Sequence, residues 1–94
     1  MHVVVNHLRL RDPMSDATLQ ALQHGVQLSV DAGAHEARVL RVDPTHLLLT
    51  FPSAEDADRV AREVGGPWMR EHISPLLAGG TERSLGEVIA SASA

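Results

Sequence analysis

The segment HVVVNHLRL, residues 2–10, is apolar on both of the faces that a β-strand would present. Its valines favour a strand, and a turn-forming Arg-Asp-Pro sequence follows it directly. Side chains alternate between the two faces of a strand, so Val4 and Leu8 share one face while Val3 and Val5 share the other. A strand of this composition predicts a sheet that is covered on both faces.

The following segments alternate between helical and strand patterns. Ser15 is a suitable N-cap for a helix that would end at Gly33. The apolar residues of this helix recur at the spacing of a single helical stripe: Leu19, Leu22, Val26 and Val30. Two apolar strands, 37–42 and 45–51, flank an Asp-Pro turn and predict a hairpin.

The second half of the chain repeats the pattern. Ser53 begins a helix with a sequence like a capping box, and Gly65-Gly66 ends it. A third helix is predicted from 66 to 79, and a last strand from 81 to 91 with a bulge at Gly86. The resulting order predicts an α+β, ferredoxin-like βαββαβ fold with a four-stranded antiparallel sheet. The helices would cover one sheet face and a second copy of the sheet would cover the other, which predicts a homodimer.

Length and composition limit the function classes. The 94 residues form one domain, 1–94, without cysteine for disulfide or thiolate chemistry. The net charge is −4 and the eight basic residues, all arginine, are scattered, so no nucleic-acid partner is expected. No stretch approaches the ~20 apolar residues of a membrane helix and no signal peptide opens the chain, so we expect a cytoplasmic protein without a membrane partner. The histidines show no zinc spacing, and no metal site is expected.

The third predicted helix carries one ionisable ring within an apolar stripe. At about 100° per residue, one arc of this helix contains Trp68, His72, Leu76, Met69 and Ile73. Because this arc should face the core, we expect His72 to be partly buried. The structural alternative is a half-exposed histidine at the end of the helix layer.

Asn6 is the second chemically unusual position, because this amide lies between Val4 and Leu8 on one strand face. A buried amide needs a hydrogen-bond partner, which would be the backbone, a water or a ligand. Phe51 and Trp68 are the only aromatic residues, and both fall where they could line one cavity between sheet and helices. The chain contains no GxSxG, P-loop, GxGxxG or HExxH motif.

Taken together, these segments resemble the antibiotic-biosynthesis-monooxygenase superfamily of dimeric α+β barrels. The resemblance covers nearly the whole chain. It rests on VVVNHLRL, on RVLRVDPTHLLLTFPS with the SAEDADRVA helix, and on WMREHISPLL before the last strand. It implies a homodimer whose two sheets close a barrel, with a ligand pocket in each protomer between sheet and helices.

The resemblance points to two branches of that superfamily. One oxidises aromatic polyketides without metal or flavin, and the other binds and degrades haem through an Asn, a Trp and a His. Asn6 matches the first-strand Asn and His72 the haem-ligating helix histidine. Phe51 stands at the position of the strand-end Trp, for which Trp68 does not substitute.

The preferred function is a cofactor-independent monooxygenase acting on a small apolar aromatic ligand. Asn6 and His72 would be catalytic, with Asn6 holding a substrate oxygen and His72 transferring a proton. The residues expected in the substrate pocket are Phe51, Trp68, Met69 and Leu76. One alternative is a haem-binding or haem-degrading monooxygenase with His72 as the axial ligand. Another is a non-catalytic ligand-binding or structural homodimer.

Overall fold

The computed structural model describes residues 2–93, so Met1 and Ala94 of the predicted domain lie outside the described residues. The strands are β1 (His2–Arg9), β2 (Arg38–Asp43), β3 (His46–Phe51) and β4 (Glu82–Glu87). The helices are α1 (Asp16–Asp31), α2 (Ala54–Val60) and α3 (Gly66–His72), with a π-helical turn η1 (Ala61–Gly65) and a 3₁₀ turn η2 (Ser74–Leu76). Within this part of the chain, no helix combines the length and the apolar composition needed to cross a membrane.

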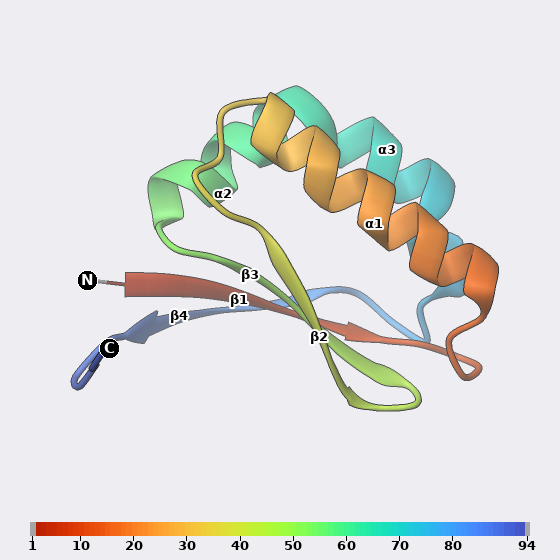
Figure 1. Ribbon diagram of the computed structural model, residues 1–94. Helices are drawn as coiled ribbons and strands as arrows, with labels where there is room; N and C mark the ends of the chain where they lie inside the picture. Colours follow the sequence, from red (N-terminus) through yellow and green to blue (C-terminus); the bar gives the residue numbers. More distant parts are fainter. Residues whose placement is uncertain (1, 94) are drawn as a thin grey trace.

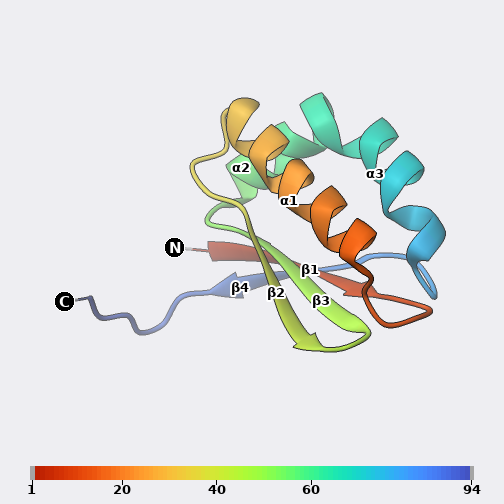
Figure 2. The same ribbon diagram turned by 45° about the vertical axis from the view of Figure 1, so that its right-hand side comes forward.

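The four strands form one antiparallel sheet in the order β2-β3-β1-β4, and all the helices lie on one of its faces (Figures 1 and 2). This is the ferredoxin-like arrangement that the order of the sequence patterns predicted. The strand predicted at 81–91 is shorter: β4 ends at Glu87, which pairs with His2, the first residue of β1. Gly86 pairs with Val3 in an unbroken register, so the predicted bulge is wrong.

α1 begins as predicted but presents a different face to the sheet. The Ser15 hydroxyl accepts a hydrogen bond from the Thr18 amide at 3.2 Å. The buried residues are Thr18, Leu22, Gly25 and Ser29, whereas Leu19 and Val30 of the predicted stripe are 41% and 44% exposed. The spacing of the apolar residues predicted the position of the helix correctly but not its buried face. Small residues of α1 are buried instead, and one of them, Gly25, lies against Trp68 of α3.

The segment from α2 to α3 also departs from prediction. Helical conformation continues through Gly65-Gly66, where a break was predicted, in the wider turn η1. Pro67 lies in the first turn of α3, where the missing backbone N–H is tolerated. The predicted helix 66–79 ends at His72, since Pro75 restrains the residue before it and η2 replaces the last turns.

The interior consists of two apolar clusters under the helices. The first contains Leu8, Leu10, Leu22, Leu47, Ile73 and Leu77. The second contains Val4, Ala34, Phe51, Ala57 and Val60. Val4 and Leu8 of β1 belong to different clusters, and Asn6 lies between them on the same strand face. The two clusters therefore flank Asn6 on this face of the strand.

Within residues 2–93, no helix lies on the opposite face of the sheet (Figure 1). Val3, Val5 and Leu48 are only partly buried there. Leu40 and Val42 of β2 are 46% and 57% exposed. An apolar sheet face without a covering layer is unusual for a monomeric domain.

Candidate functional site

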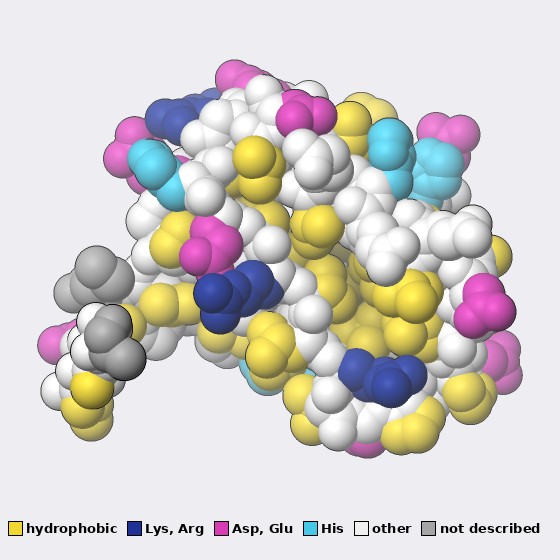
Figure 3. Space-filling view, in the orientation of Figure 1, with side chains coloured by type: hydrophobic (Ala, Val, Ile, Leu, Met, Phe, Trp, Pro, Cys, Tyr) yellow, Lys and Arg dark blue, Asp and Glu magenta, His cyan; other side chains and the backbone are white. Residues whose placement is uncertain are grey.

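A cavity of about 270 Å³ lies between the sheet and the helices, between the two apolar clusters. Its walls come from Leu8 and Leu22 of the first cluster, from Phe51, Ala57 and Val60 of the second, and from Trp68 and Met69 of α3. A second hollow, of about 390 Å³, opens between α1 and β2 and shares Leu22, Val26 and Val39 with the first. Figure 3 shows apolar side chains lining this opening.

Trp68 is positioned by a close helix–helix approach. A Cβ atom placed on Gly25 of α1 would lie 2.5 Å from the Cη2 atom of the Trp68 indole, so only glycine fits with the ring in this place. The adjacent Ser29 donates its hydroxyl proton to the Gly25 carbonyl at 2.8 Å, and Ser29 also lines the cavity. The glycine that weakens α1 as a helix therefore makes room for the aromatic wall of the cavity.

Asn6 lines the cavity, as its place on the strand predicted. Its Nδ2 atom donates to the Leu49 carbonyl at 3.4 Å, a long contact. A primary amide offers two N–H donors and one carbonyl acceptor. Within residues 2–93 this is the single hydrogen bond of the Asn6 side chain, so most of its hydrogen-bonding capacity is open to a ligand.

Thr81 and Arg83 also line the cavity, although neither was predicted from the sequence as a site residue. Arg83 is the direct partner of Asn6 in the β1–β4 register, and directly paired residues of adjacent strands share a face. Its Nη2 atom donates to the Asp58 Oδ1 atom of α2 at 3.1 Å. Arg83 could have been found only through its pairing with Asn6, an inward-facing residue of β1. That pairing is known only once the register of β1 and β4 is known.

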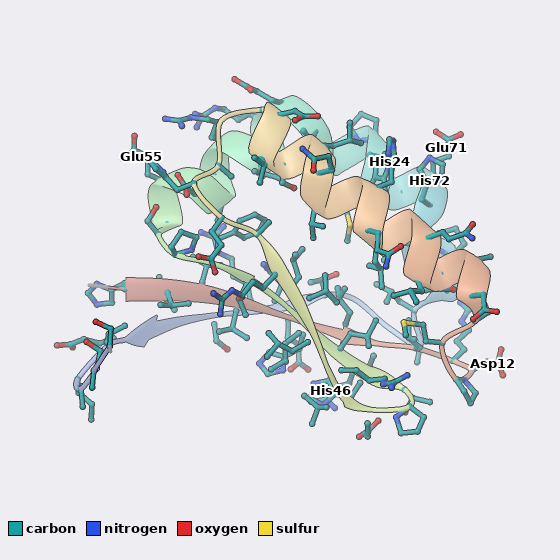
Figure 4. All side chains as sticks on the ribbon, viewed as in Figure 1. Asp12, His24, His46, Glu55, Glu71 and His72 are labelled. Carbon is teal, nitrogen blue, oxygen red and sulfur yellow. The ribbon has the colours of Figure 1, made fainter. Side chains whose placement is uncertain are left out.

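His72 does not line the cavity, and its side chain is 44% exposed rather than partly buried as predicted. The residue that follows α3, Ile73, is 1% exposed, and it takes the buried position that was predicted for the arc of His72. The His72 ring packs on Trp68 with 5.2 Å between ring centroids, and its Nε2 atom lies 3.9 Å from the Glu71 Oε2 atom. Figure 4 shows His72 with Glu71 on the outer side of α3, away from the sheet.

The other predicted pocket residues divide in the same way. Phe51, Trp68 and Met69 line the cavity. Leu76 does not, and it is 37% exposed. The helical arc was extended through Pro75, but α3 ends at His72, so Leu76 is no longer in phase with Trp68.

A different polar arrangement closes the end of the layer where α2 begins. Ser53 caps α2 by accepting from the Asp56 amide at 3.1 Å, as the capping-box pattern predicted. The Asp56 carboxylate is 1% exposed and does not return to Ser53. It accepts from the His35 amide at 2.8 Å and contacts the His35 Nδ1 atom at 3.0 Å. Burial alone would raise the pKa of Asp56, but the His35 hydrogen bonds and the nearby His35 and Arg59 charges outweigh it and leave the pKa below its ordinary value.

The sequence matches no protein-family model and no curated protein. Solved structures match its fold. An antibiotic biosynthesis monooxygenase aligns with a TM-score of 0.75 at 14% identity, over 96% of this chain and 100% of that one. A candidate antibiotic biosynthesis monooxygenase from Nitrosomonas europaea aligns with a TM-score of 0.75 at 15% identity, over 94% of this chain and 89% of that one.

A second protein from Nitrosomonas europaea, described as being of unknown function, aligns with a TM-score of 0.76 at 11% identity, over 99% of this chain and 93% of that one. The fold that the sequence predicted is thus shared with these solved structures. Because one fold serves many functions, the residues of the cavity must carry the functional argument.

Proposed function

We propose that the protein is a cofactor-independent monooxygenase that binds a small apolar aromatic substrate in the cavity between sheet and helices. The observation that carries the proposal is that Asn6 and Trp68 line the same, mainly apolar cavity. Ligand sites of this kind combine apolar walls with a few polar groups that fix orientation. The monooxygenase names of structures with the same fold favour this chemistry over others that the cavity could serve.

The proposed reaction oxidises an activated ring CH2 group to a ketone. The carbon loses two hydrogens and gains one oxygen atom of dioxygen, and the second oxygen atom leaves as water. All the electrons come from the substrate, so atoms and electrons balance with dioxygen as the only co-reactant. The substrate first loses a proton to become an enolate, and electron transfer from this enolate to dioxygen starts the oxidation.

Asn6 would hold the substrate oxygen on which the enolate charge develops. Its N–H groups lie within the cavity wall, where low polarity strengthens a hydrogen bond to a charged oxygen. Phe51, Trp68 and Met69 would exclude water from the carbanion. Within residues 2–93 the cavity lining contains no His, Asp or Glu, so a substrate acidic enough to ionise in solution suits it best.

The cavity fits haem poorly. His72, the expected axial ligand, lies outside the lining with its ring on the outer side of α3. Phe51 stands where the haem-degrading branch has a tryptophan, and the Trp68 indole is held against Gly25. We therefore assign no step of the proposed reaction to haem.

We propose that the active form is a homodimer that covers the outer face of the sheet. The support is an apolar surface that no helix within the described residues covers, formed by Val3, Val5, Leu48, Leu40 and Val42. Leu48→Asp should give a monomer, because it would bury an unpaired carboxylate between the sheets. Light scattering of wild type and variant at micromolar concentration tests this, and a monomeric wild type would overturn it.

The oxygenase proposal can be tested with anthrone, an apolar tricyclic ketone with an acidic CH2 group. Oxygen uptake and the absorbance of the anthraquinone product are followed with wild type, Asn6→Leu and heat-unfolded protein, since anthrone also oxidises slowly alone. Wild type should accelerate both signals, and Asn6→Leu should lose most of the acceleration while remaining folded. Binding of anthrone without acceleration of its oxidation would favour a non-catalytic ligand-binding protein. The described lining residues include no acid–base side chain, and this observation also favours that alternative.

A further inference from the structure

We infer that Arg83 makes the cavity selective for aromatic ligands that carry an anionic oxygen substituent, such as an enolate, a phenolate or an aromatic carboxylate. The inference rests on the proposed ligand site and narrows the class of substrate. It starts from the charges around the cavity. Within residues 2–93, Arg83 is the single charged side chain of the lining, and every other lining residue is uncharged.

The sheet register places this charge beside the amide that would hold the substrate. Asn6 and Arg83 are directly paired on β1 and β4, so their side chains leave the sheet from neighbouring positions on the same face. Both line the cavity. An oxygen atom held by Asn6 would therefore have the guanidinium as its nearest charged neighbour in the lining. A hydrogen bond that involves a charged donor and a charged acceptor is stronger than a neutral one.

The guanidinium also has capacity for a ligand. Its contact with Asp58 uses the Nη2 atom, at 3.1 Å, and the guanidinium has five N–H donors in total. The side chains of Arg83 and Asp58 are 46% and 54% exposed, so this ion pair contributes little and a ligand anion can share the guanidinium. Asp58 would then compete with the ligand anion for the guanidinium.

This selectivity also answers how a proton could leave the substrate without a basic side chain in the lining. A positive charge next to the substrate oxygen stabilises the ionised form and lowers its pKa. The substrate would bind as the anion, already prepared for reaction with dioxygen. Arg83 is thus inferred to be a specificity residue that touches the substrate.

The experiment compares two matched probes, 2-naphthoate and 2-naphthamide, which have nearly the same shape and differ in charge. Binding is measured at neutral pH by calorimetry and by the fluorescence of Trp68, the only tryptophan, which lies in the cavity wall. Wild type should bind the carboxylate about tenfold more tightly than the amide, the usual effect of a hydrogen bond to a charged group. Arg83→Gln should remove this difference by weakening naphthoate binding while leaving naphthamide binding unchanged.

Two further variants serve as controls. Arg62→Gln removes the same charge from an exposed residue outside the lining and should leave both affinities unchanged. Asp58→Asn removes the competitor and should tighten naphthoate binding severalfold. Equal binding of the two probes by wild type, or an Arg83→Gln variant that keeps the preference for naphthoate, would overturn the inference while the cavity site stands. Failure of both probes to bind would instead count against the ligand site itself.

Discussion

Two regions between the helices and the sheet differ in how far their polar side chains are hydrogen-bonded within the protein. At the α2 end, around Asp56, the buried carboxylate accepts a hydrogen bond from the His35 backbone N–H and contacts the His35 Nδ1 atom. In the middle, around Asn6, a polar amide faces a cavity and makes one long hydrogen bond. The first arrangement joins the loop after α1 to α2 and serves stability. The second leaves bonding capacity unused, which is the expected condition of a residue that binds a ligand.

The largest effect on stability should come from the α2 end. Asp56→Ala removes the acceptor of the His35 amide and of its ring, and leaves a cavity in the buried wall of α2. We expect a loss of about 1–3 kcal/mol in the free energy of unfolding. Urea titration measures it, and Glu55→Ala, an exposed residue in the same turn of α2, is the matched control. A change at Asp56 no larger than at Glu55 would remove the distinction between the two regions.

Acid should weaken the α2 end in a predictable direction. The pKa of Asp56 lies below its ordinary value of 3.8 in the folded state, so the unfolded state binds the proton more readily. The stability from this carboxylate is complete above pH 3.8 and is lost as pH falls through the lowered folded pKa. Chemical unfolding between neutral pH and strong acid should show this loss in wild type and a smaller one in Asp56→Asn. Parallel curves for the two proteins would contradict the assignment.

A substitution at Gly25 tests whether Trp68 forms a wall of the ligand site. Gly25→Ala puts a methyl group 2.5 Å from the present position of the Trp68 ring, so the ring must move into the cavity. Overpacking costs about 1–3 kcal/mol, and the better helix propensity of alanine returns about 1 kcal/mol, so the net loss should be small. Binding of 2-naphthamide should fall strongly. The double variant Gly25→Ala/Trp68→Leu should restore stability, because the smaller side chain no longer overlaps the new methyl group. Unchanged binding of 2-naphthamide by Gly25→Ala would show that Trp68 does not form the wall of the ligand site.

The sequence predicted the fold well because strands and helices leave separate periods in it. The valines of β1, the hairpin and the Ser15 and Ser53 caps were each visible in local pattern. The site was predicted in part, since Asn6, Phe51, Trp68 and Met69 line the cavity. The failures at His72 and Leu76 have one cause. A helical wheel gives angles between residues but not which arc faces the sheet or where the helix ends.

Other features depend on tertiary geometry that no local pattern contains. The pairing of Asn6 with Arg83 requires the β1–β4 register. The fit of Trp68 over Gly25 requires the approach of α3 to α1. The Asp56–His35 contact links residues 21 positions apart, and the capping-box pattern pointed Asp56 back to Ser53 instead. In each case the missing information is the position of one element relative to another.

The smallest effect on stability should come from the residues that the sequence analysis assigned to catalysis. Asn6→Leu replaces an amide that makes one hydrogen bond of 3.4 Å, and the Leu49 carbonyl left behind can be hydrated from the cavity. His72→Phe keeps the ring packed on Trp68 and loses only an exposed contact to Glu71. Both melting temperatures should stay near that of wild type. The two variants should differ in function, because Asn6 lines the cavity and His72 does not.

Asn6→Leu should therefore lose most of the acceleration of anthrone oxidation, and His72→Phe should retain it. Thermal melts and oxygen uptake on the same preparations give both results together. A severe loss of melting temperature in Asn6→Leu would make this amide a structural residue like Asp56, and the contrast between the two regions would disappear. A loss of activity in His72→Phe at unchanged stability would show that His72 takes part in the reaction. It would then have to act through Trp68, whose ring it contacts, because its own position lies outside the cavity wall.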